Sequence, residues 1–406
     1  MIKNIISIML DTLFVPIGLI IYISSLLIPK NKRLWLFGSW FGQKYSDNSR
    51  YLFEYVNSFH PEIDAIWLTR DEKSYQEILK QGNKVERIDS LRAFILVLKA
   101  GCLIICADSS DVLGRFSRYI KVRLIQLWHG TGLKKLKETG RMNGKLAKLI
   151  AKIIPFYLPG YKMVVATSKL SALTIADALK TPVERVVITG YPRNDTLLIR
   201  TDNIRTSGRA FCFDKSASPS LLIAYLPTCR DGKVDLFLKY KFNYRKLQNT
   251  LRAIDANMII KPHFYNTLTI DIPLESENRV FIFNDSDIPD IYKILPSVDI
   301  LITDYSSVLF DYLLLDRPII FAPFDLEEYM EKTTDFYFEY DDVTPGYKAK
   351  DWDDIIKYLI ILANGGDIHR KERFLISKLF NKYNDGNNSE RVFKSIAEML
   401  GVIHEN

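Results

Sequence analysis

Short, wholly apolar segments alternate with amphipathic helical segments along most of this chain, and this alternation restricts the fold more than any other feature. Strands without polar residues are typical of parallel sheets that helices cover on both faces. Asp47–Asn57 and Ser168–Leu179 are examples of the intervening helical segments. The sequence therefore predicts an α/β fold with these strands: Leu34–Phe37, Ala65–Leu68, Leu103–Cys106, Leu124–Trp128, Met163–Ala166, Val186–Thr189, Leu222–Leu226, Met258–Ile260, Val280–Phe283, Ile300–Thr303 and Pro318–Phe321.

The predicted strands fall into two groups, which indicates two domains. With 406 residues the chain is longer than a usual single domain. Arg200–Ser220 separates the groups, is rich in Ser, Thr, Asp and Arg, and has no sustained apolar period. We therefore expect an α/β domain at residues 31–205 and another at residues 206–406. Their sheets would face a shared cleft with the carboxyl ends of their strands.

The N-terminal segment differs from the rest of the chain. Ile5–Ile28 is almost wholly apolar and about as long as a bilayer-crossing helix. Three residues weaken a simple spanning helix: Asp11, Pro16 and Gly18. A basic cluster follows at once, and it favours a cytoplasmic location for the rest of the chain: Lys30, Lys32 and Arg33. We expect residues 1–30 to associate with the membrane, either by crossing it or by lying in one leaflet.

A second basic segment follows His129, in a chain whose formal net charge is +7. Apolar residues recur at helical spacing in its later part, as in a helix that binds anionic lipid. An ordinary solvated helix with an inward apolar face would show the same pattern. We expect an anionic membrane as a partner and no nucleic acid. The basic residues are Lys134, Lys135, Lys137, Arg141, Lys145, Lys148, Lys152 and Lys162.

His129 is the strongest candidate for a catalytic residue. It follows the predicted strand Leu124–Trp128, and Gly130 and Gly132 allow a tight turn directly after it. Ligands of doubly wound sheets bind at such strand ends. The near-neutral pKa of histidine suits a general base at cellular pH. Gly130 and Thr131 are candidates for acceptor contacts or for a structural role in the same loop.

Anion-binding residues follow three strands of the second group. Arg230 and His263 each offer hydrogen-bond donors to a diphosphate, although each would also fit a solvated loop. Ser306 and Ser307 stand at a predicted helix start, where backbone amides and hydroxyls favour phosphate or cap the helix. Thr303 and Asp304 precede them, and Asp304 suits either a turn or contacts to ligand hydroxyls.

Two further polar residues and the cysteines complete the set. Arg193 and Asp195 lie in the turn-prone stretch after Val186–Thr189, where a structural role is at least as well supported as an acceptor contact. The four cysteines are scattered and have no nearby histidine cluster, so the sequence predicts no zinc site and a reducing compartment.

Taken in order, these motifs resemble the CDP-glycerol glycerophosphotransferase family, whose members prime and polymerise teichoic acids and related capsule chains. The resemblance covers roughly residues 35–350. Two departures concern Gly132, where the family commonly has Pro, and Cys229, where an aromatic residue is common. The matching stretches are Gly38–Arg50, Trp128–Thr131, Gly190–Asp195, Pro227–Asp231, Lys261–His263, Thr303–Ser307, Asp311–Tyr312 and Arg317–Ile319.

The resemblance implies a GT-B-like pair of Rossmann-like domains with a central cleft, acting at the cytoplasmic face of a bacterial membrane. It implies that His129 is the base and that Arg230, His263, Ser306 and Ser307 bind the diphosphate. The expected reaction moves glycerol phosphate from CDP-glycerol to a hydroxyl of a lipid-linked polymer and releases CMP. CDP-ribitol as donor, or a GT-B sugar-nucleotide glycosyltransferase, are the alternatives. No cofactor is implied, and a magnesium requirement stays open.

Overall fold

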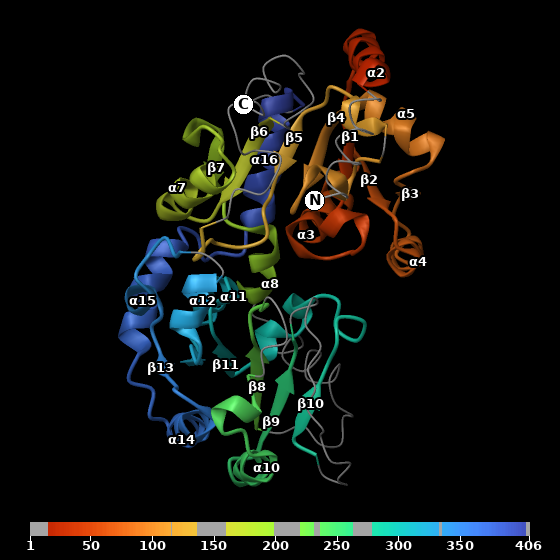
Figure 1. Cartoon of the computed structure of the whole chain (residues 1–406). Coiled ribbons are helices and arrows are strands. Elements are labelled where there is room, and N and C mark those ends of the chain that lie inside the picture. Colours follow the sequence, from red (N-terminus) through yellow and green to blue (C-terminus); the bar gives the residue numbers. More distant parts are fainter. Residues whose placement is uncertain are drawn as a thin grey trace.

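The computed structural model describes residues 15–114, 116–135, 160–198, 220–230, 236–262, 278–332 and 335–402. The described chain forms two lobes, each built on one parallel sheet, with the site candidates between them (Figure 1). His263, most of the basic segment after Lys135 and residues 1–14 lie outside the described residues.

The first sheet has the strand order β3-β2-β1-β4-β5-β6-β7, and every pair is parallel. The order reverses between β1 and β4, because the chain builds outward from β1 to β3 and then returns to β1's other side. This makes β1 and β4 the switch point of the sheet. The strands are β1 (Asn31–Phe37), β2 (Asp64–Thr69), β3 (Val85–Arg87), β4 (Ala100–Ile105), β5 (Leu124–Gln126), β6 (Tyr161–Ala166) and β7 (Val186–Ile188).

The second sheet has the order β10-β9-β8-β11-β12-β13 and is also parallel throughout. Its switch point lies between β8 and β11 by the same reasoning. All eleven predicted strands are present, which confirms the two-sheet α/β fold. The strands are β8 (Leu221–Leu226), β9 (Ala256–Ile260), β10 (Val280–Ile282), β11 (Ile300–Thr303), β12 (Ile319–Phe321) and β13 (Tyr347–Lys348).

Helices cover both faces of each sheet. In the first lobe they are α2 (Val15–Leu27), α3 (Asp47–Phe59), α4 (Glu72–Lys80), α5 (Leu91–Lys99), α7 (Lys169–Ala178) and α8 (Asp195–Leu198). The others are α10 (Tyr244–Ala253), α11 (Val308–Tyr312), α12 (Leu326–Lys332), α13 (Tyr340–Val343), α14 (Trp352–Ala363), α15 (Arg370–Phe380) and α16 (Asn388–Leu400). Successive strand residues alternate between two apolar clusters, as buried parallel strands do: Trp35 and Phe37 on one face, Leu34 and Leu36 on the other.

The last helix, α16, returns to the first lobe, where Figure 1 shows it beside β5 and β6. Val392, Phe393 and Ile396 are buried in the same cluster as Trp35. The ring of Phe393 lies 5.4 Å from that of Trp35. Residues 388–400 therefore complete the core of the first lobe although they follow the whole second lobe in sequence, an arrangement that the boundary at residue 206 did not anticipate.

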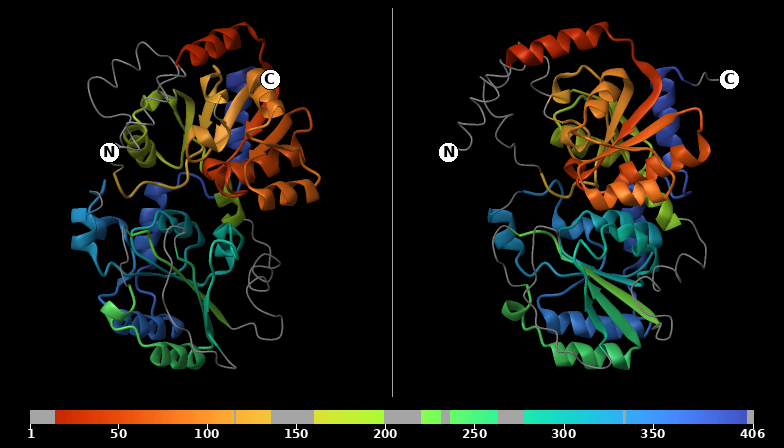
Figure 2. Two further views of the ribbon diagram at one scale, coloured as in Figure 1. Left: turned by 45° about the vertical axis from the view of Figure 1, so that its right-hand side comes forward. Right: turned by 90° about the vertical axis from the view of Figure 1, so that its right-hand side faces the viewer.

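Helix α2 lies at the end of the first lobe that points away from the second lobe (Figures 1 and 2). Ser25 anchors it, because its hydroxyl accepts a hydrogen bond from the Lys121 amide at 2.9 Å. Most of its large apolar side chains are exposed: Ile17, Leu19, Ile20, Ile23, Leu26 and Leu27. Within the described ranges, no helix has the length and apolar character needed to span a bilayer.

We expect Phe393→Ala to lower the free energy of unfolding by about 3–5 kcal/mol, because it leaves a cavity against Trp35. Urea unfolding followed by tryptophan fluorescence measures this, since four of the five tryptophans belong to the first lobe. Phe374→Ala on α15, where the ring is 54% exposed, is the matched control and should cost less than about 1 kcal/mol. Equal losses for the two variants would contradict a core role for α16.

Candidate active site

His129 lies at the carboxyl end of β5, three residues after the strand ends and beside the switch point of the first sheet. Its Nδ1 lies 2.9 Å from the carbonyl oxygen of Cys106, which follows β4. A carbonyl oxygen only accepts hydrogen bonds, so Nδ1 carries the proton and Nε2 of the neutral ring is left as a base. Burial lowers the pKa of His129, while the nearby Asp47 carboxylate opposes that shift. The neutral, proton-accepting form is therefore favoured at cellular pH.

The backbone around His129 is held in an unusual conformation. Trp40, Phe41, Asp47 and Trp128 have φ values of 46°, 61°, 64° and 59°, in the left-handed region that residues other than glycine rarely adopt. All four residues line the cleft near His129. Such strained positions cluster at functional sites, where the surrounding structure keeps them in place.

Two hollows open on either side of His129. The second-lobe hollow lies at the β8–β11 switch point and is lined among others by Lys44, Asp47, Arg193, Pro227, Lys261, Asp285 and Tyr292. The first-lobe hollow, of about 450 Å³, lies at the β1–β4 switch point and is lined among others by Phe41, Asp108, Gly130, Thr131, Lys134, Thr228 and Cys229. Four residues line both hollows: Trp40, His129, Ser306 and Ser307.

Ser306 and Ser307 reach both hollows because the His129 loop approaches them closely. A Cβ atom on Gly130 would lie 2.3 Å from the Ser307 Oγ, and the φ of Gly130 is +148°. Only glycine fits this approach. Ser307 is the N-cap residue of α11 and its hydroxyl makes no capping bond, while the Ser306 Oγ accepts from the Val308 amide at 3.4 Å. The Ser307 hydroxyl is therefore not used in capping.

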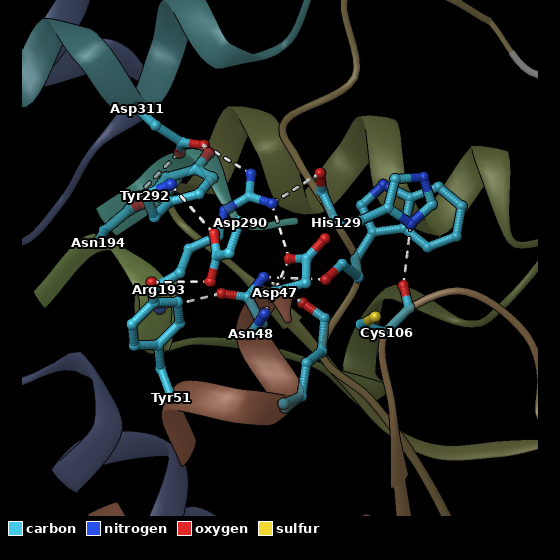
Figure 3. Close-up of polar contacts among 12 residues, drawn as sticks. Asp47, Asn48, Tyr51, Cys106, His129, Arg193, Asn194, Asp290, Tyr292 and Asp311 are labelled. Carbon is cyan, nitrogen blue, oxygen red and sulfur yellow. Dashed lines mark hydrogen bonds and ion pairs between the residues drawn. The ribbon is translucent and has the colours of Figure 1, made fainter. Parts of the chain in front are cut away.

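Arg193 joins the two lobes in a buried polar network (Figure 3). Its guanidinium donates to Asp47 at 2.7 Å, to the His129 carbonyl at 3.0 Å and to Asp311 of the second lobe at 2.6 Å. Asn194 donates to the other oxygen of Asp311 at 3.0 Å. Because Arg193 also supports the His129 backbone, it ties the position of the base to the relative placement of the lobes.

Other polar pairs extend this link. The Tyr51 hydroxyl donates to Asp290 at 2.9 Å, from α3 to the second lobe (Figure 3). Lys44 of the first lobe lies 2.5 Å from Asp285 of the second, and Lys261 lies 2.9 Å from the other oxygen of the same carboxylate. Burial raises the pKa of Asp285, but the two ammonium groups outweigh it and hold this pKa below its usual range.

Three residues predicted to bind the donor lie beneath the cleft surface. The Arg230 guanidinium donates to both oxygens of Asp325 and to Asp304, each within 2.9 Å, and is 4% exposed. Asp304 also accepts from the Thr228 amide, and the Thr303 hydroxyl donates to the Leu226 carbonyl at 2.9 Å. These residues hold together the loops after β8 and β11.

Two candidates for acceptor contacts have structural partners. The Asp195 carboxylate accepts from the amides of Asn388 and Ser389 at 2.8 Å, so it caps α16. Thr131 pairs with Thr167 at 3.2 Å while also lining the first-lobe hollow. The described residues contain no group of three or more His, Cys, Asp or Glu side chains that fits a metal ion.

Sequence reasoning did not single out several lining residues. Asp285 lies in a loop without a glycine or motif that marks a strand end, so no signal identified it. Lys44 lies in the family-like stretch Gly38–Arg50, shortly after Gly42, and that position was the available signal. Lys261 directly follows β9 and belongs to the family-like stretch Lys261–His263, and its strand-end position was the available signal. Asp47 begins a helix and would pass for an ordinary N-terminal acidic residue.

Two Rossmann-like lobes whose switch points open on one shared histidine define a GT-B-type architecture. A model of the family described as CDP-Glycerol:Poly(glycerophosphate) glycerophosphotransferase matches residues 20–398. The chain belongs to this glycerophosphotransferase family, as its motifs predicted.

Named relatives agree with this membership. The chain is 28% identical over 390 residues to a teichoic acid glycerol-phosphate transferase of Staphylococcus aureus, covering 93% of this chain and 96% of the relative. It is 29% identical over 283 residues to a teichoic acid ribitol-phosphate primase of Bacillus spizizenii, covering 68% and 69%. The structure of the wall teichoic acid polymerase TagF has the same fold, with a TM-score of 0.71, 24% identity, and coverage of 93% and 91%.

The pKa of His129 should lie below the ordinary value of 6.5, because burial disfavours the charged ring. Asp47→Asn should lower it further, since the carboxylate that favours the imidazolium is lost. The chemical shift of the His129 ring protons, followed by NMR across pH, measures both values. The ring signals of the other four histidines should not respond to the substitution. An increase of the His129 pKa in Asp47→Asn would contradict the electrostatic role of Asp47.

Proposed function

We propose that this enzyme transfers glycerol phosphate from CDP-glycerol to a hydroxyl group of a lipid-linked teichoic acid or capsule-type polymer and releases CMP. The observation that carries the proposal is the pair of hollows that share His129, Ser306 and Ser307. A two-substrate transfer needs such a geometry, with one pocket for each substrate and the base where they meet. Family membership favours this reaction over sugar-nucleotide glycosyl transfer.

The donor belongs in the second-lobe hollow. Lys44 and Lys261 bring two ammonium groups to its mouth, where Asp285 now bridges them. A diphosphate offers the same type of charge as that carboxylate and more acceptor oxygens, so it suits both lysines. The hydroxyls of Ser306 and Ser307 face the same hollow and serve the phosphate nearer His129. His263, if it acts here as the family motif implies, would add a further donor.

In this proposal Arg230 does not contact the donor. It holds the residues that position the donor-binding serines. Its guanidinium lies against the stacked rings of Tyr305 and Tyr329, 4.8 Å from each centroid, and holds Asp304 and Asp325. Asp304 in turn accepts from the amide of Tyr305, which precedes the serines. Arg230 therefore fixes the turn that presents Ser306 and Ser307.

The chemical step follows from the free Nε2 of His129. The acceptor hydroxyl oxygen attacks the phosphorus that bears glycerol, and His129 takes the hydroxyl proton on Nε2. A new O–P bond forms while the bond from this phosphorus to the oxygen of CMP breaks, and its electron pair leaves with CMP. Alignment and charge neutralisation supply most of the catalysis of such transfers. A positioned base adds about 10²–10⁴-fold.

A ribitol phosphate transferase is the second candidate, because a ribitol-phosphate primase is among the relatives and the described lining does not distinguish the two polyols. Incubating the full chain with CDP-glycerol or CDP-ribitol and an acceptor, then measuring released CMP, separates them. Release of CDP or of another nucleoside diphosphate would contradict both candidates.

His129→Ala should lower the turnover of CDP-glycerol by at least about 10²-fold, because the base is lost while the donor hollow keeps its lysines. CMP release measures the rate, and calorimetric titration with CDP-glycerol should give a near-normal affinity. His60→Ala, at the C-terminal end of α3, is the matched control because His60 lines neither hollow, and it should keep normal turnover. A folded His129→Ala variant with near-normal turnover would remove the base assignment.

The exposed apolar face of α2 supports membrane association at the cytoplasmic face as part of this proposal. At 1 M salt, the full chain should stay on vesicles that contain anionic lipid, since burial of apolar groups gains about 0.8 kcal/mol per methylene regardless of screening. A chain that starts at Lys30 should bind at low salt through the basic segment and dissociate at high salt, where the Debye length is about 3 Å. Vesicle co-sedimentation measures both.

A double substitution on the helix tests this role without truncation. Ile20→Asp together with Ile23→Asp should release the protein from vesicles at high salt, because both side chains are more than half exposed. Leu375→Asp on α15 adds a charge at a leucine that is 53% exposed on the other lobe, and should leave binding unchanged. Retention of the double variant at 1 M salt would contradict a membrane role for α2.

A further inference from the structure

The first-lobe hollow is lined by a lysine, Lys134, that does not line the second-lobe hollow proposed for the donor. Lys134 follows the His129 loop, and its Nζ donates to the Tyr329 hydroxyl at 3.2 Å, the one hydrogen-bond partner that it has among the described residues. None of the ion pairs found in the described chain involves Lys134. Burial lowers the pKa of Lys134, and the Asp304 carboxylate, which is already bonded to Arg230, opposes that shift. An ammonium group with three donor hydrogens therefore lines this hollow, and no carboxylate of the described residues forms an ion pair with it.

A buried hydroxyl lies in the same hollow. Thr228 is 6% exposed, and within the described part of the chain its Oγ1 has no hydrogen-bond partner. The backbone of Thr228 is fixed, because its amide donates to Asp304 at 2.9 Å and its carbonyl accepts from Arg230 at 2.8 Å. A buried polar atom without a partner costs about 1–3 kcal/mol, so a ligand that bonds to it is favoured.

The position of this hollow suits the second substrate. It shares His129, Ser306 and Ser307 with the second-lobe hollow, so a molecule bound here meets the base from the side away from Lys44 and Lys261. In-line transfer requires the attacking and leaving oxygens on opposite sides of the phosphorus. A polyol-phosphate chain end carries a free hydroxyl group close to an anionic phosphodiester. A base beside a cation and a hydroxyl donor matches that pair of groups.

We propose that the first-lobe hollow is the acceptor subsite and that Lys134 and Thr228 bind the phosphodiester next to the attacking hydroxyl. The inference rests on the proposed function and adds to it that the enzyme selects acceptors by the charge of their terminal unit. Lys134 sets acceptor affinity in this arrangement, while Lys44 and Lys261 set donor affinity.

Two soluble probes separate charge recognition from hydroxyl recognition. The methyl phosphodiester of glycerol carries one negative charge, and the methyl ether of glycerol has the same two free hydroxyls and no charge. At saturating CDP-glycerol, Lys134→Met should lower kcat/KM for the charged probe by about 10- to 100-fold and for the neutral probe by less than about 3-fold. Methionine keeps the length of the side chain and removes the ammonium group that contacts the ring and the hydroxyl of Tyr329.

Calorimetry provides the second readout and does not depend on turnover. Lys134→Met should weaken binding of the charged probe to the same extent and leave the affinity for CDP-glycerol within about 2-fold. Lys134→Arg should recover most of the binding, because the charge returns. Thr228→Val should weaken the binding of the charged probe by a few-fold. Lys135→Met is the matched control, since Lys135 is exposed and does not line the hollow.

The outcomes distinguish this inference from the proposed function. Equal losses for the two probes in a folded Lys134→Met variant, or weaker binding of CDP-glycerol, would overturn the acceptor subsite while leaving the reaction intact. Failure of the unmodified chain to release CMP from either CDP-polyol would overturn the proposed function. In that case calorimetry still tests the subsite. Binding of the charged probe that is lost in Lys134→Met would support the subsite, and binding that Lys134→Met leaves unchanged would reject it.

Discussion

The pairing of Arg193 with Asp47 and Asp311 is the interaction on which the rest of the site depends. Three charges are buried together, and each is compensated by the others and by neighbouring amides and hydroxyls. Removing one member of a buried charge network typically costs 3–5 kcal/mol, because the remaining charges lose their partners. Since Arg193 also holds the His129 carbonyl, the same contacts that join the lobes position His129.

The two switch points explain why one cleft can serve two substrates. Each sheet ends in a crevice where its strand order reverses, and the lobes face each other so that the crevices meet at His129. The sheets themselves carry almost no polar groups and act as rigid supports. Chemistry is confined to the loops after β1, β4, β5, β8, β9 and β11, which the packed strands hold in place.

Much of this arrangement could be predicted from the sequence, because wholly apolar strands and strand-end residues are local signals. β3 and β13 escaped prediction because they are short edge strands of three and two residues. The packing of α16 on the first lobe was not predicted either, because the apolar face of a helix does not indicate which sheet the helix covers. Likewise the sequence marks Arg230 as a strand-end cation, but only the fold brings Asp304 and Asp325 against it.

The return of α16 to the first lobe has a consequence for biosynthesis. Proteins are made from the N-terminus, and domains generally fold as they emerge. The second lobe can complete its sheet and helices once Phe380 has been made. The first lobe, although synthesised earlier, lacks Val392, Phe393 and Ile396 until the whole second lobe has been synthesised. Its unfinished core must therefore wait for the second lobe, so the half of the enzyme that carries His129 matures last.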